Sequence, residues 1–346
     1  MFEAVVTLCV MGGDPCREAL LAGYEAAEVA GCAAGLVAAP PDLGPFAGYV
    51  LRKSPHCAPA ADMLAFTEVA PGVFLHRGLI EEPAVGNGGD VANIGFVIGE
   101  ISVAVIDSGS ARWVGEAVWR AIRAQTDLPV SHVILTHMHP DHVLGAEVFA
   151  QTGTKVVGHA GLNRALADRR ANYLDSLTDL IGPAQFIGTE TVRVDIPVGG
   201  EGEIDLGGRR IALRAWPLAH TGTDLTALDL QSGLLFTGDL VFDEHTPALD
   251  GSVIGWQTVL AEMSDLRVTQ VMPGHGGPLL DWPAGAAPML RYLSVLAADT
   301  RAAIAAGRRL GDAVRTIAQS EAAHWKLFDA FNARNATVAF TELEWE

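Results

Sequence analysis

The stretch Thr136-His137-Met138-His139-Pro140-Asp141-His142, THMHPDH, holds three histidines and one aspartate among seven residues. It directly follows His132-Val133-Ile134-Leu135, an apolar run that predicts a short buried strand. An ordinary surface loop has no need of so many imidazoles and a carboxylate in one place. Neutral imidazole and carboxylate are ligands of Zn²⁺, and also of Fe²⁺ and Mn²⁺. The stretch therefore predicts a metal site where this strand ends.

Three more polar positions follow predicted strands later in the chain. His220 comes after a strand that ends at Leu218, Asp239 after one that ends at Thr237, and His275 after one that ends at Met272. Glycines beside these positions let the backbone turn sharply and approach a site closely. A lone histidine is more often an ordinary core or surface residue, but that explanation would have to hold for four separate clusters. Together the clusters supply enough ligands for two ions with one shared ligand: His137, His139, Asp141, His142, His220, Asp239 and His275.

The pattern of apolar residues beyond Phe66 predicts two strand-rich halves with helices between the strands. The first half has expected strands at 94–98, 103–106 and 155–157 and expected helices at 112–125 and 163–181. The second half has expected hairpins over 204–218 and 225–237, a helix at 256–266, a strand at 268–272, and helices at 288–306 and 311–323. Two such halves predict an α/β fold in which two sheets face each other with helices outside.

All four cysteines lie in the first part of the chain, at Cys9, Cys16, Cys32 and Cys57. Their spacing does not match the close pairs of a zinc finger. A small segment is often stabilised by disulfides in an oxidising compartment, so we expect two disulfides, for which three pairings exist. The alternative is four buried thiols in a cytosolic protein. Within this part we expect a helix over 16–30 and an irregular Pro-rich passage over 40–59, which places the domain boundary between 1–62 and 63–346.

The formal net charge of −18 argues against a nucleic-acid partner, because that binding depends on clustered Lys and Arg. No run of about 18 apolar residues predicts a membrane span. The N-terminal residues do not resemble an intact secretory signal. The partner that we expect is therefore neither a nucleic acid nor a membrane, and we predict a small-molecule substrate.

Taken together, THMHPDH, His220, Asp239 in GD and His275 in PGHG resemble the metallo-β-lactamase superfamily, over about residues 66–282. The resemblance implies the family's αβ/βα four-layer sandwich, here with a small cysteine-containing N-terminal segment. It also implies one ion on His137, His139 and His220 and another on Asp141, His142 and His275. Asp239 would bridge the two. The bridging Asp239 is absent from the true β-lactamases, and it favours the pattern of the glyoxalase-II-like members.

Further stretches resemble one subgroup, the quinoprotein relay system zinc metallohydrolases. They are GDVANIGFVIG (89–99), HTPALDGSVIGW (245–256) and the terminal ELEWE, together with the cysteine-bearing segment CREALLAGYE. This resemblance implies a periplasmic or secreted protein linked to a quinoprotein dehydrogenase system, whose signal peptide is not in this chain. A cytoplasmic location is the alternative. The oligomeric state is left open.

The function that these features predict is that of a dinuclear zinc hydrolase, with iron or manganese as alternative metals. A metal-bound hydroxide would attack an ester, thioester, lactone or amide, with weak β-lactamase activity on the side. Asp141 is expected to orient the nucleophile, and His245 to face the pocket. His159 and Asn93 are further candidates, at the rim and beneath the metals. The alternatives are an iron-dependent persulfide dioxygenase and a metal-binding module without catalysis.

Overall fold

The N-terminal segment forms a small antiparallel sheet of its own. The computed structural model describes residues 1–346, and this sheet has the strand order β2-β1-β3. Its elements are β1 (Phe2–Cys9), β2 (Cys16–Ala26), α1 (Val29–Ala38), the 3₁₀ helix η1 (Gly44–Phe46) and β3 (Val50–Pro59). Disulfides join Cys9 to Cys16 and Cys32 to Cys57, so the prediction of two disulfides is confirmed. The first links neighbouring strands, and the second ties α1 to β3.

The prediction of a helix over 16–30 was wrong, because most of this stretch is strand β2. Leu20 packs into the core of the large body, while its neighbours Ala19 and Leu21 pack on the other side, into the N-terminal core. Successive side chains that point to opposite sides are typical of a strand that is buried on both faces. The helix begins only at Val29, and the passage expected to be irregular contains strand β3. Tertiary contacts have overridden the helical propensity of the local sequence.

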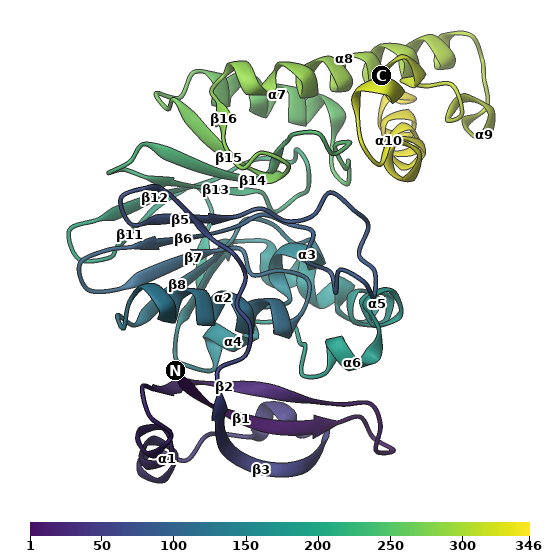
Figure 1. Ribbon diagram of the computed structural model, residues 1–346. Coiled ribbons are helices and arrows are strands. Elements are labelled where there is room, and N and C mark those ends of the chain that lie inside the picture. The colour runs from purple at the N-terminus through teal and green to yellow at the C-terminus, as the bar shows by residue number, and fades with distance from the viewer.

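The first large sheet has seven strands in the order β10-β9-β8-β7-β6-β5-β4. They are β4 (Thr67–Ala70), β5 (Val73–His76), β6 (Ile94–Ile98), β7 (Val103–Ile106), β8 (Val130–Leu135), β9 (Lys155–His159) and β10 (Ile196–Val198). The associated helices are α2 (Arg112–Gln125), α3 (Pro140–Val143), α4 (Glu147–Ala150), α5 (Leu162–Ile181) and α6 (Pro183–Phe186). Figure 1 shows α2 and α4 between this sheet and the N-terminal sheet.

The second large sheet has six strands in the order β11-β12-β13-β14-β15-β16. They are β11 (Glu201–Asp205), β12 (Arg210–Ala215), β13 (Leu225–Asp229), β14 (Leu234–Phe242), β15 (Gln270–His275) and β16 (Leu280–Asp281). The helices on its outer side are α7 (Val253–Ser264), η2 (Ala284–Ala286), α8 (Ala287–Ala305), α9 (Leu310–Ala313), η3 (Gln319–His324) and α10 (Phe328–Leu343). The prediction of one helix over 311–323 is therefore wrong: only the short helices α9 and η3 lie there, and the long helix α10 follows them.

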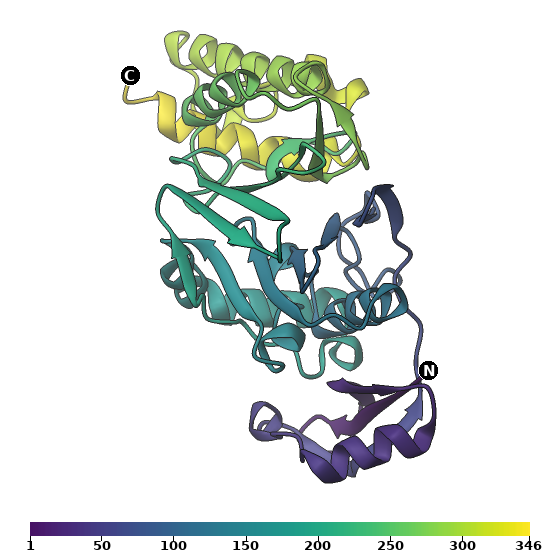
Figure 2. The ribbon, with the colours of Figure 1, turned by 90° about the vertical axis from the view of Figure 1, so that its left-hand side faces the viewer.

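Three buried apolar layers hold the large body together. One lies between the two sheets and includes Ile106, Ile134 and Phe236. A second lies between the first sheet and α2, and a third between the second sheet and the C-terminal helices. The order helix, sheet, sheet, helix is visible in Figures 1 and 2. The predicted αβ/βα four-layer sandwich, with its cysteine-containing N-terminal segment, is confirmed.

None of the helices combines the length and the apolar character that a membrane crossing requires.

Candidate metal centre

The seven residues singled out in the sequence meet at one edge of the two large sheets. His137 and His139 follow β8, Asp141 and His142 lie in α3, His220 follows β12, and Asp239 and His275 belong to β14 and β15. Their potential ligand atoms form two groups in which all atoms lie within 4.8 Å of one another. The groups are His137, His139, His220 and Asp239, and Asp141, His142 and His275. The side chains are therefore positioned to bind metal ions.

Two glycines allow the backbone to come this close. Gly238 adopts a φ of +50° directly before Asp239. A Cβ atom on Gly274 would lie 1.9 Å from Asp239 Oδ1, so any larger residue there would displace this carboxylate. These positions need glycine because the neighbouring chain leaves no room for a side chain.

Hydrogen bonds on the outside of the cluster fix the orientation of three imidazole rings. His220 Nδ1 donates to the carbonyl oxygen of Ala248 at 2.6 Å, and His275 Nδ1 donates to that of Val91 at 2.9 Å. His142 Nδ1 donates to Asp107 Oδ2 at 2.8 Å. A neutral ring that donates from Nδ1 carries a free lone pair on Nε2. All three lone pairs then face the centre of the cluster.

Asp107 orients a further ligand through Thr136. Thr136 Oγ1 donates its single proton to Asp107 Oδ2 at 2.8 Å, so towards His137 Nδ1, 3.0 Å away, it can only accept. His137 thus also presents Nε2 without a proton. Asp107 itself has a φ of +61°, a conformation that costs energy in a residue other than glycine. The Asp107 carboxylate thereby fixes the tautomers of two rings, that of His142 directly and that of His137 through Thr136.

The His139 ring has the opposite orientation, with Nδ1 toward the cluster and Nε2 away from it. Its Nε2 donates to Asp250 Oδ2 at 3.2 Å, and its Nδ1 lies 3.0 Å from His220 Nε2. Asp250 is held in turn by Arg169, with 3.0 Å between Nη2 and Oδ2. In these tautomers two lone pairs face each other at hydrogen-bond distance with no proton between them. A cation placed between the two nitrogens removes that repulsion.

Two buried atoms at the centre have no hydrogen-bond partner. They are His137 Nε2 and Asp239 Oδ1, which both lie inside the cluster. Asp239 Oδ1 is 3.2 Å from His142 Nε2, but in the tautomer assigned above this nitrogen carries no proton to donate. Buried polar atoms are rarely left without a partner. The donor set therefore fits divalent ions with nitrogen and oxygen ligands.

The histidines of the two ligand groups differ in their charge state. Burial lowers the pKa of His220 to about 3 and that of His137 well below its usual range, so both rings are neutral at pH 7. Burial would also lower the pKa of His275, but Asp239 and Asp141 raise it to about 9. The carboxylates of Asp141 and Asp239 thus favour a positive charge close to them. Either a proton on an imidazole ring or a bound metal ion supplies that charge.

A cavity of about 410 Å³ opens onto the cluster. Asp141 and Asp239 lie at its base, and His245 lines its wall as the sequence led us to expect. Burial lowers the pKa of His245 to about 4, and its Nδ1 donates to the carbonyl oxygen of Thr246 at 2.6 Å. The neutral ring therefore keeps a lone pair on Nε2. Residues of α10 also line the cavity, and Phe331 packs on the His245 ring with 4.7 Å between centroids.

Two weaker candidates have different outcomes. Asn93 Nδ2 donates to the carbonyl oxygens of Pro273 and Gly276 at 2.8 and 2.9 Å, so it braces the turn that carries His275, as expected. His159 does not line the cavity and accepts a hydrogen bond from Gly161 N instead.

Sequence reasoning missed Asp107, Asp250 and Arg169 as parts of the site. Asp107 offered a signal, because it is a polar residue directly after the predicted strand 103–106. Asp250 and Arg169 gave none, since they meet His139 only through the fold.

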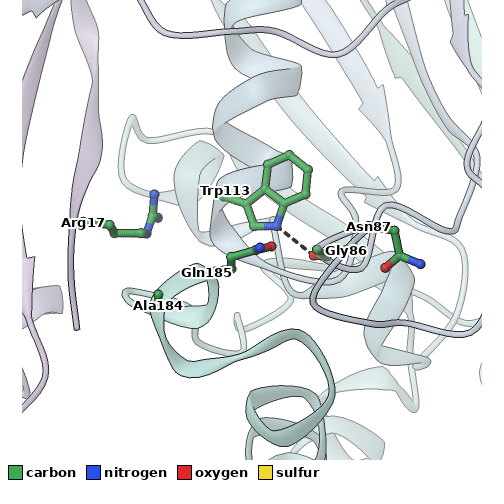
Figure 3. A pocket seen from close by; sticks show the side chains of 7 residues that line it. Arg17, Gly86, Asn87, Trp113, Ala184 and Gln185 are labelled. Atoms are coloured by element: carbon green, nitrogen blue, oxygen red, sulfur yellow. Dashed lines mark hydrogen bonds between the residues drawn. The ribbon is translucent and has the colours of Figure 1, made fainter. Parts of the chain in front are cut away.

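A second cavity, of about 450 Å³, lies away from the cluster beside Trp113 (Figure 3). Its tryptophan Nε1 donates to the carbonyl oxygen of Gly88 at 2.8 Å, and its one cation, Arg17, already pairs with Glu116. The cavity contains no nucleophile or general base, so the chemistry belongs to the first cavity.

Comparison with known proteins agrees with this geometry. A Beta-lactamase-like protein 2 homolog from Caenorhabditis elegans is 24% identical over 170 residues, which are 47% of this chain and 47% of that protein. The chain thus spans about half the length of this curated relative. A solved metallo-beta-lactamase from Pontibacter korlensis superposes with a TM-score of 0.55 at 20% identity, over 67% of this chain and 99% of that chain.

A sec-alkylsulfatase, Pisa1 from Pseudomonas sp., superposes with a TM-score of 0.60 at 13% identity, over 81% of this chain and 50% of that chain. At these identities the solved structures share the fold with this chain. The Metallo-beta-lactamase superfamily model matches residues 87–276, more than half of the sequence, and includes every residue of the cluster. The chain therefore belongs to the metallo-β-lactamase superfamily.

Proposed function

We propose that this protein is a dinuclear zinc hydrolase that acts on a carbonyl-type substrate. The observation that carries the proposal is the position of Asp239 between two groups of inward-facing ligand atoms. Asp239 Oδ2 lies 3.5 Å from both His220 Nε2 and His275 Nε2, which belong to different groups. In this proposal His137, His139 and His220 would hold one ion, Asp141, His142 and His275 would hold the other, and Asp239 would be shared.

Divalent ions in these positions would lower the pKa of a water molecule and polarise a carbonyl oxygen. The protein's own residues would orient the reactants. The Asp141 side chain keeps 18% of its surface exposed at the base of the cavity, and we assign it the acceptance of a hydrogen bond from the attacking water. Burial alone would raise the pKa of Asp141, but His142 and His275 hold it well below the usual range, so the carboxylate is an acceptor at neutral pH.

We assign His245 to a proton relay: Nε2 would accept the proton released by the attacking water and pass it to the leaving group. Its ring is neutral at pH 7 and is fixed by Thr246, which leaves Nε2 free to accept a proton. The ring also packs against His275, with 4.8 Å between centroids. His245→Gln should therefore lower kcat while the metal content stays unchanged.

The cavity supports a small-molecule substrate. Its volume of about 410 Å³ lies in the range typical of small-ligand sites, and apolar side chains such as Phe242, Leu249 and Val338 line it. We propose an ester, thioester, lactone or amide as the reacting group, with weak opening of β-lactams as a side reaction.

Elemental mass spectrometry and a hydrolysis screen test the proposal together. We expect close to two zinc ions per chain and hydrolysis of at least one of these substrate classes, and we expect Asp239→Asn to lose both. A content of one iron, with oxygen uptake on a persulfide, would replace the proposal by a dioxygenase. Two zinc ions with no hydrolysis of any class would favour a metal-binding module without catalysis.

We further propose an oxidising compartment such as the periplasm, and a link to a quinoprotein dehydrogenase system. Both disulfides support the first point, since disulfides persist where thiols are not kept reduced. The link to a quinoprotein depends on the resemblance of 89–99 and 245–256 to that subgroup. Fractionation of the native host, followed by co-purification from the periplasmic fraction, tests both. In the same proposal residues 1–62 are a unit separate from the catalytic body at 63–346.

A further inference from the structure

We propose that the substrate carries a carboxylate, which the guanidinium of Arg334 binds at the α10 wall of the cavity. This inference rests on the proposed hydrolase function and names the substrate class of the same site. Arg334, Phe331 and Val338 all line the cavity that opens onto Asp141 and Asp239. A substrate bound in this cavity would therefore lie against both the ligand cluster and residues of α10.

Helix α10 is held firmly against the loop beside the cluster. The side chain of Asn335 accepts from Leu249 N at 2.9 Å and donates to the carbonyl oxygen of Pro247 at 2.6 Å. Two helical turns further along, Glu342 accepts from Ser252 Oγ and from Val253 N. The same loop contains Ala248 and Asp250, whose oxygens orient His220 and His139. The position of Arg334 relative to the cluster is thus set by buried hydrogen bonds.

Arg334 has no anionic partner within the protein. It makes neither an ion pair nor a side-chain hydrogen bond, and its guanidinium carbon lies 5.8 Å from the centre of the Phe331 ring. The other arginine of the cavity, Arg169, is already paired with Asp250. Glu81, which also lines the cavity, accepts from Asn87 Nδ2 at 3.0 Å and forms no ion pair with Arg334. Arg334 is therefore the cation of this cavity that remains available to a ligand.

The chemistry of the wall suits a carboxylate attached to an apolar group. A guanidinium offers two parallel N–H donors that match the two oxygens of a carboxylate. Phe331 and Val338, one turn before and one turn after Arg334, offer apolar surface to the adjoining carbon atoms. In a chain of net charge −18 an unpaired arginine at a cavity mouth also distinguishes anionic from neutral ligands.

The test compares two aryl thioesters that differ only at the far end of the acyl chain, which is a carboxylate in one and a primary carboxamide in the other. Wild-type, zinc-loaded protein should prefer the carboxylate in kcat/KM by about tenfold, the size expected of one charge-assisted pair. Arg334→Ala should remove the preference through a higher KM, with little change for the carboxamide. Arg334→Lys should retain part of it. The control is Arg309→Ala, which removes an exposed arginine that is likewise unpaired but lies outside the cavity.

The inference is overturned if Arg334→Ala affects both thioesters equally, or if the wild-type protein shows no preference. If neither thioester is hydrolysed, the proposed function still stands or falls on the screen of esters, lactones and amides, and binding decides the inference. Calorimetry with metal-free protein then compares 3-phenylpropionate with 3-phenylpropanamide. Tighter binding of the acid that disappears in Arg334→Ala supports the carboxylate site, and equal binding rejects it.

Discussion

Single residues outside the ligand set decide whether the ligands point inward. Asp107 shows this most clearly, because its two oxygens together accept from the backbone of Thr136, the hydroxyl of Thr136 and the ring of His142. Residues that hydrogen-bond to metal ligands commonly change metal affinity by about 10- to 100-fold when they are replaced. The strained φ of Asp107 indicates that the surrounding fold holds this residue in place for that purpose.

We predict that Asp107→Asn weakens metal binding by about 10- to 100-fold without unfolding the protein. Asparagine tolerates the positive φ, so the backbone can stay as it is. Its amide, however, offers one acceptor oxygen in place of two. Chelator competition measures the affinity, and Asp127→Asn, in an exposed loop, is the control. Unchanged affinity would mean that Asp107 serves the fold alone.

At the scale of elements, buried ion pairs attach the N-terminal sheet to helix α2. Glu116 on α2 accepts from Arg17 on β2 through both oxygens at 2.9 Å and from Arg112 at 3.0 Å. Arg120, one turn along, pairs with Glu3 on β1 at 2.9 Å. Because these groups are buried, the loss of one partner leaves an uncompensated charge. Strand β2 is therefore fixed by the body against which it packs.

We predict that Glu116→Gln lowers the free energy of unfolding by about 3–5 kcal/mol, because Arg112 stays buried without its counter-charge. Urea unfolding measures the change. The matched control is Glu203→Gln, which removes the partner of Arg210 in an exposed pair and should cost at most about 1 kcal/mol. Equal effects of the two replacements would show that the Glu116 network contributes little.

The disulfide between Cys32 and Cys57 closes a loop between positions 25 apart in the sequence. We predict that replacing both cysteines by serine lowers stability by about 3 kcal/mol, through the restored entropy of the unfolded chain. Hydrolysis should be unchanged at temperatures where the protein stays folded, since no residue of 1–62 lines the catalytic cavity. A parallel loss of kcat would assign the N-terminal segment a part in the site.

For the whole molecule, the metal ions and the fold should stabilise each other. The ligand residues come from both large sheets, from β8 and α3 on one side and from β14 and β15 on the other. Ions bound between them cross-link the two halves of the sandwich. A ligand that binds only the folded state raises stability with its concentration.

We predict that chelator treatment lowers the melting temperature and that added zinc restores it. The difference should shrink as the pH falls from about 7.5 to about 5, because protons compete with metal for His275, whose pKa burial lowers but Asp239 and Asp141 raise to about 9. Calorimetry of loaded and stripped protein at both pH values measures this. The outcome against the prediction is a melting temperature that does not depend on metal at either pH.

The sequence by itself determined the sandwich and the ligand set, because both depend on local patterns. Apolar runs that end in histidine, aspartate and glycine identify the strand ends, and parallel strands bring such ends to one edge of a sheet. These patterns are enough to predict that His137, His220 and Asp239 lie close together. Their assignment to metal ions also used the resemblance to a family.

Only the tertiary structure decided which residues orient the ligands and which wall closes the cavity. Asp250 reaches His139 across 111 positions of sequence, and Arg334 enters the cavity from a helix that was not predicted at all. A helix was predicted where strand β2 lies, because one face of this strand packs on the large body and the other in the N-terminal core. In each case the residues that make contact lie far apart in the sequence. Local periodicity and spacing therefore could not predict the contact.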